Sequence, residues 1–183
     1  PGQQGGKAVA EVLFGDYNPA GKLPVTFYRN VSQLPDFEDY NMTGRTYRYM
    51  QDVPLFPFGY GLSYTTFGYG KTVFDKNELT AGQSLKLTVP VTNTGKRNGE
   101  EVVQVYLRKQ GDAEGPIKTL RAFKRVSIPA GKTVNVEFDL KDKELEWWDD
   151  QSNTVRVCPG NYDIMVGGSS KEEDLQRTTI AIK

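Results

Sequence analysis

The chain has 183 residues, which is enough for one domain of ordinary size and an additional segment. Its 23 basic and 23 acidic residues cancel, and no apolar run approaches the roughly 20 residues of a membrane span, so we expect neither a nucleic-acid nor a membrane partner. The sequence has no histidine and a single cysteine, which excludes Ser-His-Asp and Cys-His catalysis and imidazole zinc sites within it, and we expect no metal or cofactor.

Residues 1–66 show an irregular pattern. The first element has a one-sided apolar stripe made of Ala8, Val9, Val12 and Leu13. This spacing predicts a helix, which Gly15 ends. Leu23 to Tyr28 is rich in β-formers and is predicted to be a short strand, followed by a long stretch of aromatic residues and prolines.

One helix and one strand cannot bury the apolar surface of residues 1–66 by themselves. We therefore expect this segment to be the tail of an α/β sandwich domain whose remainder lies upstream, since the chain opens at Pro1 without an initiator methionine. The sandwich described next and a second copy of the chain are the alternative packing partners. A homodimer is thus a further expectation.

Residues 67–183 show the period of two that is typical of half-buried strands. The alternating apolar residues are Leu85, Leu87, Val89 and Val91, then Val134, Val136, Phe138 and Leu140, then Tyr162, Ile164 and Val166. Turn-forming residues separate them, and 102–107 is apolar on both faces, as in a central strand. About seven strands at regular spacing predict a mainly β fold, an immunoglobulin or fibronectin type III-like β-sandwich.

Three local features of the second region give further expectations. Pro90 inside a strand pattern predicts an edge position or a bulge. Ser169 to Gln176 is charged and polar, which predicts a solvated loop. Cys158 stands between apolar neighbours and is expected to be a buried, unreactive thiol.

Several long motifs resemble glycoside hydrolase family 3. They are Pro1-Gly2-Gln3-Gln4-Gly5-Gly6, Ala10-Glu11-Val12-Leu13-Phe14-Gly15, Gly21-Lys22-Leu23-Pro24, Gly44-Arg45-Thr46-Tyr47-Arg48-Tyr49 and Pro54-Leu55-Phe56-Pro57-Phe58-Gly59. Leu120-Arg121-Ala122-Phe123 and Gly160-Asn161-Tyr162 resemble the fibronectin type III-like domain that ends many of its members. The resemblance covers nearly the whole chain, with a departure at Gln4, where many members have Glu.

The resemblance implies a parent enzyme with a TIM-like barrel, an α/β sandwich and this terminal domain. Such an enzyme is a retaining exo-β-glycosidase, a β-glucosidase or β-xylosidase, that is secreted to the periplasm or the exterior and acts on oligosaccharides. Its nucleophile and acid/base both precede the residues present here, so we assign no catalytic residue. The upstream domains of the same polypeptide are the expected partners. A non-catalytic immunoglobulin-like interaction or carbohydrate-binding module is the alternative function.

Carboxylates for retaining chemistry have to face each other about 5–5.5 Å apart. The acids considered are Glu38-Asp39, Glu144, Glu146 and Asp149-Asp150. Each stands in a charged, turn-like run that is typical of a solvated loop. We therefore predict that the chain alone is inactive.

Four residues are substrate-binding candidates. Trp147 and Trp148 offer rings on which a pyranose could stack, although one of two neighbours is expected to face the core. Tyr47 and Arg48 stand among aromatic residues where a substrate could approach. The structural alternative is that Tyr47 packs against the missing domain and that Arg48 pairs with an acid or stacks on tyrosine.

Overall fold

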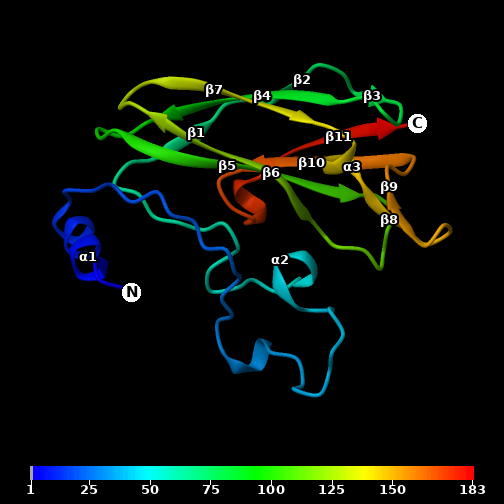
Figure 1. Cartoon of the computed structure of the whole chain (residues 1–183), viewed down its shortest axis with the longest axis horizontal. Helices are drawn as coiled ribbons and strands as arrows, with labels where there is room; N and C mark the ends of the chain where they lie inside the picture. The colour runs from blue at the N-terminus through cyan, green and yellow to red at the C-terminus, as the bar shows by residue number, and fades with distance from the viewer. Residues whose placement is uncertain (1) are drawn as a thin grey trace.

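The computed structural model describes residues 2–183, and Figure 1 shows a two-sheet sandwich with a long, irregular segment along one side. Pro1, which opens the first motif, lies outside the described residues. The chain is mainly β, and regular sheet structure begins at Phe67. The predicted β-sandwich is therefore confirmed.

The first sheet is organised around one long strand, β4. Its members are β1 (Phe67–Tyr69), β2 (Val73–Phe74), β4 (Leu85–Asn93) and β7 (Thr133–Leu140). β7 pairs with β4 along one edge, while β1 and β2 share the other edge. The four alternating residues of β4 are fully buried, as the period of two predicts.

The second sheet has five strands and faces the first. Its order is β3 (Glu78–Leu79), β11 (Gln176–Ile182), β10 (Gly160–Gly167), β5 (Gly99–Lys109) and β6 (Thr119–Ile128). Only the β11–β3 pair is parallel among the described residues. The central position predicted for 102–107 is confirmed, because β5 pairs with β10 and β6.

A smaller hairpin and short helices complete the described chain. The hairpin joins β8 (Trp147–Asp149) to β9 (Thr154–Arg156). The helices are α1 (Gly5–Phe14), η1 (Val31–Gln33), α2 (Thr46–Tyr49), α3 (Asp142–Leu145) and η2 (Glu172–Asp174). α1 ends at Gly15, whose φ of 82° is left-handed, as predicted. Cys158 is buried in the sandwich core, also as predicted.

The strand predicted at Leu23 to Tyr28 is wrong. This stretch makes one isolated bridge, from Phe27 to Phe56, and a separate pair of hydrogen bonds between Leu23 and residues 59–60. Pro24 and Pro57 lack an amide hydrogen, so a continuous ladder cannot form between these two contact points.

The edge position predicted at Pro90 is wrong, because β7 lies on one side of β4 and β1 and β2 lie on the other. The predicted irregularity is present: between the Tyr69–Val91 and Val73–Thr88 pairs, residues 70–72 lie opposite Val89 and Pro90, one residue more on that side than on β4. The carbonyl of Pro90 accepts a hydrogen bond from the amide of Gly70, 2.7 Å away, in the gap between β1 and β2. The amide of a residue in an antiparallel strand points to the same side as its carbonyl. The interruption between β1 and β2 therefore lies where Pro90 has no hydrogen to donate.

The helices are all short. Within residues 2–183, none combines the length and the apolar character needed to cross a bilayer.

Candidate functional site

Tyr47 is held by packing where residues 1–66 meet the sandwich. Its ring stacks on Phe58 with centroids 4.2 Å apart and meets Tyr106 edge-on at 5.9 Å. Its hydroxyl accepts a hydrogen bond from the amide of Leu120 at 3.1 Å. Tyr47 therefore anchors α2 on β5 and β6. This is a packing role, as in the structural alternative to substrate binding, but Tyr47 packs on the sandwich and not on the missing domain.

Arg48 lies beside the residues that lead into β6. Its carbonyl accepts a hydrogen bond from the amide of Ile117 at 2.7 Å. Its guanidinium carbon lies 5.5 Å from the centroid of the Tyr49 ring, so the stacking alternative is observed. No acid among residues 2–183 forms an ion pair with it, and its Nε is buried without a hydrogen-bond partner there.

Trp147 and Trp148 face opposite ways, as neighbours on a strand do. Trp147 is 3% exposed, meets Tyr162 edge-on at 6.2 Å and donates its indole hydrogen to Asp112. Trp148 is 49% exposed and donates its indole hydrogen to Asp150 at 2.8 Å. The expectation that one of the two faces the core is confirmed, and only Trp148 offers a ring to solvent.

Arg121 is the residue at this junction that sequence reasoning missed as a site residue. Leu120 pairs with Tyr106 and Ala122 with Val105, so Arg121 is the extra residue of a β-bulge. Its guanidinium carbon lies 5.6 Å from the centroid of the Trp147 ring, and it donates to the carbonyl of Glu146. Bulges re-aim side chains and have no clear signature in a single sequence.

The acidic residues considered for catalysis are held in local structure. The amide of Asn41 donates to Asp39 and lowers the pKa of its carboxyl. The Ser152 hydroxyl and the Arg156 guanidinium lower the pKa of Asp149 to about 2. Glu144 closes a capping box at the start of α3. Among residues 2–183, no group of three or more His, Cys, Asp or Glu side chains is arranged to hold a metal.

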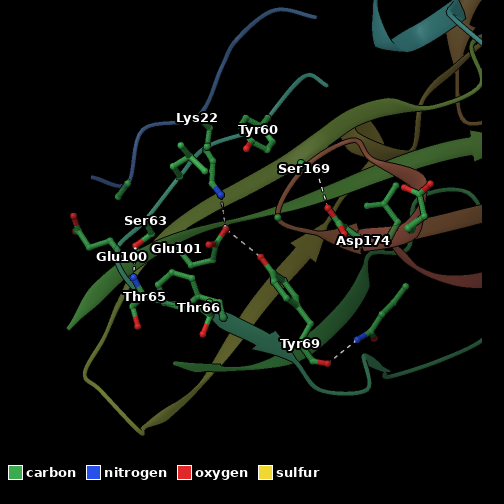
Figure 2. Close-up of a pocket in the computed structure, with 18 residues that line it drawn as sticks. Lys22, Tyr60, Ser63, Thr65, Thr66, Tyr69, Glu100, Glu101, Ser169 and Asp174 are labelled. Atoms are coloured by element: carbon green, nitrogen blue, oxygen red, sulfur yellow. Dashed lines mark hydrogen bonds and ion pairs between the residues drawn. The ribbon is translucent and has the colours of Figure 1, made fainter. Parts of the chain in front are cut away.

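A cleft of about 640 Å³ lies where residues 20–22 and 60–67 cross the sandwich, and a buried ion pair lines it. Figure 2 shows Lys22 pointing at Glu101, with 2.9 Å between Nζ and Oε1 and side chains only 18% and 7% exposed. The Tyr69 hydroxyl donates to the same oxygen at 3.3 Å. Burial and the charge of Glu101 raise the pKa of Tyr69, so the phenol stays protonated and donates.

Gln104 fixes a second contact between the segment and the sandwich. Its amide nitrogen donates to the carbonyls of Gly59 and Gly168, and its oxygen accepts from the Tyr106 hydroxyl. Gly59 has a φ of 78° and lies so close that a Cβ would overlap the Gln104 oxygen. The residue at position 59 therefore has to be glycine for this contact to form.

Gly59→Ala is expected to lower the free energy of unfolding by about 2 kcal/mol, because it adds a clash to left-handed backbone strain. Gly82→Ala is the control, since Gly82 has a φ of 87° with open space around it, and it should lose about 1 kcal/mol. Urea unfolding measures both. Equal losses would show that Gly59 is not closely packed on Gln104.

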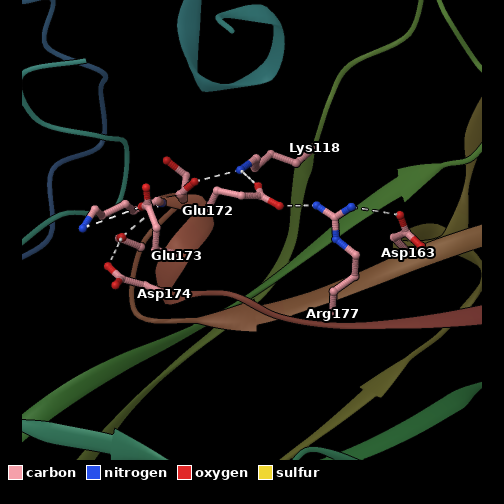
Figure 3. Close-up of polar contacts among 9 residues, drawn as sticks. Lys118, Asp163, Glu172, Glu173, Asp174 and Arg177 are labelled. Atoms are coloured by element: carbon pink, nitrogen blue, oxygen red, sulfur yellow. Dashed lines mark hydrogen bonds and ion pairs between the residues drawn. The ribbon is translucent and has the colours of Figure 1, made fainter. Parts of the chain in front are cut away.

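The loop at 169–176 is the solvated loop that its composition predicts only in part, because residues 171–174 are exposed but the two residues before them are not. Ser169 and Ser170 are buried, and Lys118, whose side chain is 8% exposed, donates to the carbonyl of Ser170 at 2.9 Å. Figure 3 shows a chain of charges from Lys118 through Glu172 and Arg177 to Asp163. Burial alone would raise the pKa of Glu172, but hydrogen bonds and charge from Lys118 and Arg177 lower it. The two contacts from Lys118, to the Ser170 carbonyl and to Glu172, join the loop to a residue more than 50 positions away and hold it against the sheet.

A second cleft, of about 550 Å³, lies beside this chain of charges. Residues 50–55 of the first segment form one wall, and Lys118, Glu172 and Arg177 line the other. Tyr47 lines this cleft, whereas the first cleft does not include it. Of the four candidates, Tyr47, Arg48 and Trp147 gather around the start of β6, and Trp148 points to solvent.

Comparison with protein families assigns both parts of the chain. Residues 1–64 match the glycosyl hydrolase family 3 C-terminal domain, and residues 101–170 match the fibronectin type III-like domain. The chain is 54% identical over its full length to a xylan 1,4-beta-xylosidase of Xylanibacter ruminicola, of which it covers 21%. It is 37% identical over 92% of its length to a periplasmic beta-glucosidase of Salmonella typhimurium, of which it covers 24%.

Solved structures agree with these relatives. A β-glucosidase from Erythrobacter marinus superposes with a TM-score of 0.84 and 42% identity over the whole chain, which covers 24% of that protein. A beta-glucosidase from Listeria innocua in complex with isofagomine gives a TM-score of 0.81 and 31% identity, with 27% of it covered. The chain thus spans about a quarter of the length of the proteins it matches, and it belongs to glycoside hydrolase family 3, of which it carries a C-terminal part that ends in a fibronectin type III-like domain.

Proposed function

We propose that the chain is an accessory part of a retaining exo-β-glycosidase that removes terminal β-linked glucose or xylose from oligosaccharides. The observation that carries this proposal is similarity over 92% to 100% of the chain to proteins named beta-glucosidase and xylan 1,4-beta-xylosidase. The two names differ in the sugar, so the proposal extends to both. The nucleophile and the acid/base belong to the remainder of the polypeptide.

The proposed layout divides the chain at the start of β1. Residues 1–66 contribute to the α/β sandwich domain, and residues 67–183 form the fibronectin type III-like domain. The change from irregular segments to paired strands at Phe67 supports this boundary. The ion pair between Lys22 and Glu101 crosses the boundary, so the second domain serves as a platform on which the first is fixed.

The exposed apolar surface of residues 1–66 supports a partner in the rest of the polypeptide. α1 has no buried residue although one of its faces is apolar, and Phe14, its last residue, is 84% exposed. Phe37 and Tyr40, in the loop before α2, are 92% and 89% exposed. Large exposed apolar patches mark interaction sites. A homodimer through the same surface is the competing explanation.

A periplasmic or extracellular location is part of the proposal. Its support is the periplasmic beta-glucosidase of Salmonella typhimurium, to which the chain is similar over most of its length. Fractionation of cells that express the whole polypeptide tests it, and activity that stays with the cytoplasmic fraction would contradict it.

Hydrolysis of aryl β-glucosides and aryl β-xylosides tests the function. The whole polypeptide is expected to release the aryl group from at least one of them, and the 183-residue chain is expected to release none. Turnover by the chain that a single carboxylate substitution abolishes would overturn the assignment of the reacting groups. A whole polypeptide that is inactive but binds oligosaccharides would favour the alternative of a binding module.

A further inference from the structure

The wall that the first segment contributes to the second cleft is fixed by hydrogen bonds. The Val53 carbonyl accepts from Arg29 Nε at 3.0 Å and from Gln33 Nε2 at 3.2 Å. The opposite wall belongs to the five-stranded sheet and to the loop that precedes β11. The volume of about 550 Å³ lies within the roughly 300–1,000 Å³ of ordinary small-ligand pockets. The cleft is therefore a preformed space of a size that suits a small ligand.

The sheet wall of the second cleft carries three bases beside two acids. Arg108 on β5 and Arg177 on β11 line it, and Lys118 lines it just before β6. Figure 3 shows Glu172 between Lys118 and Arg177, and Arg177 also faces Asp163 at 3.5 Å. Both acids are thus engaged by Lys118 or Arg177.

Arg108 is left without a counter-ion. It is half-buried and lies opposite Asp163 in the register of β5 and β10. The Asp163 carboxylate, however, already accepts from Gln110 at 2.7 Å and from Thr179 at 2.8 Å. Within residues 2–183, no ion pair includes Arg108. A half-buried guanidinium on the wall of a cleft has donors to offer to a bound ligand.

The rest of the lining offers acceptors as well as donors. Arg29 uses its Nε for the Val53 carbonyl, which leaves its two terminal nitrogens for other acceptors. Asp52 also lines the cleft, is exposed, and takes part in no ion pair with residues 2–183. Five basic and four acidic side chains line the cleft, so their charges nearly cancel. This lining favours a neutral ligand whose groups both donate and accept, as hydroxyls do.

The segment wall adds an apolar surface to these polar groups. Its apolar lining residues are Met50, Val53, Pro54, Leu55 and Pro57. Ligand pockets typically combine such a surface with a few polar groups that orient the ligand. A pyranose matches both, because its C–H faces are apolar and its edge carries hydroxyls.

We propose that the second cleft binds a neutral saccharide. Arg108 and Arg29 donate to its hydroxyls, Asp52 accepts from them, and its C–H faces pack on the wall formed by residues 50–55. That the sugar is built of glucose or xylose rests on the proposed function. The site itself rests on the cleft alone.

Isothermal titration calorimetry of the 183-residue chain with cellobiose and with xylobiose tests the site. We expect saturable binding of at least one disaccharide with a Kd of about 1 mM. The Kd should be the same at low and high sodium chloride, because the ligand is uncharged. Tryptophan fluorescence should stay constant, since neither Trp147 nor Trp148 lines the cleft. Binding that is lost in Trp148→Ala would place the sugar on the β8–β9 hairpin and overturn the proposal.

Arg108→Gln is expected to weaken binding about tenfold, because it removes a charged donor from the sheet wall. Asp52→Ala is the second variant, and it should weaken binding about threefold without unfolding the chain, since Asp52 is exposed. Arg125→Gln is the control, because Arg125 lies on the neighbouring strand β6, is exposed and does not line the cleft. It should bind with full affinity. Equal affinity of all three variants would overturn the site.

The site and the proposed function fail on different measurements. If the chain binds a disaccharide but the whole polypeptide hydrolyses no aryl β-glycoside, the proposed function is contradicted and the site is supported. If the whole polypeptide hydrolyses an aryl β-glycoside but the chain gives no heat of binding with cellobiose or xylobiose, the site is overturned and the proposed function is retained.

Discussion

Replacing Trp147 with alanine is expected to lower the free energy of unfolding by about 4 kcal/mol. The indole ring is buried in the core, packs edge-on against Tyr162 and lies beneath the guanidinium of Arg121. Its removal leaves a large cavity and takes the indole donor away from Asp112. Urea unfolding followed by circular dichroism measures the loss.

Trp148→Ala is the matched control for this substitution. Trp148 is the same residue type one position later, but its ring is half exposed and its indole donates only to Asp150 on the same hairpin. We expect a loss of about 0.5 kcal/mol, as for ordinary surface substitutions. Similar losses in the two variants would contradict the assignment of Trp147 to the core and Trp148 to the surface.

The second large effect is expected from Glu101→Gln, which should lower the free energy of unfolding by about 3 kcal/mol. The substitution leaves the Lys22 ammonium in a nearly buried place without its counter-charge. The Tyr69 hydroxyl keeps an acceptor of the same shape, so the effect isolates the charge. The loosened segment should also be cleaved faster by a protease at residues 30–45.

Glu100→Gln is the control, because it removes a neighbouring carboxylate on β5 without disturbing the pair between Lys22 and Glu101. Glu100 is the preceding residue, and it pairs with Arg125 while both side chains remain well exposed. Exposed pairs contribute little, so we expect a change of about 0.5 kcal/mol and unchanged proteolysis. A loss as large as that of Glu101→Gln would mean that the Lys22–Glu101 pair does not hold the segment.

The strands of the sandwich could be predicted from the sequence because a half-buried strand repeats every two residues. Leu85 to Val91 and Val134 to Leu140 show this repeat and pair with each other in β4 and β7. The family motifs also marked Tyr47 and Arg48, which the structure places at the junction of α2 and β6. Each of these signals is local in the sequence.

The features that could not be predicted depend on contacts between distant residues. Residues 171–174 are exposed as composition predicts, but Ser169 and Ser170 are buried where Lys118 and Arg177 hold the loop against the sheet. Arg121 is the extra, unpaired residue of a β-bulge in β6, and a single sequence gives no clear signal for such a bulge. The β-prone run from Leu23 did not form a strand, because the stretch opposite it contains Pro57 and makes only isolated contacts.

The central claim is that one face of residues 1–66 packs on the sandwich and that their exposed face packs on the rest of the polypeptide. Comparing the hydrogen exchange of the 183-residue chain with that of the whole polypeptide tests this claim. Amides of α1 and of residues 31–42 should exchange quickly in the chain and become protected in the whole polypeptide. Amides of β4, β5 and β7 should exchange equally slowly in both. Equal exchange of α1 in the two proteins would contradict the claim.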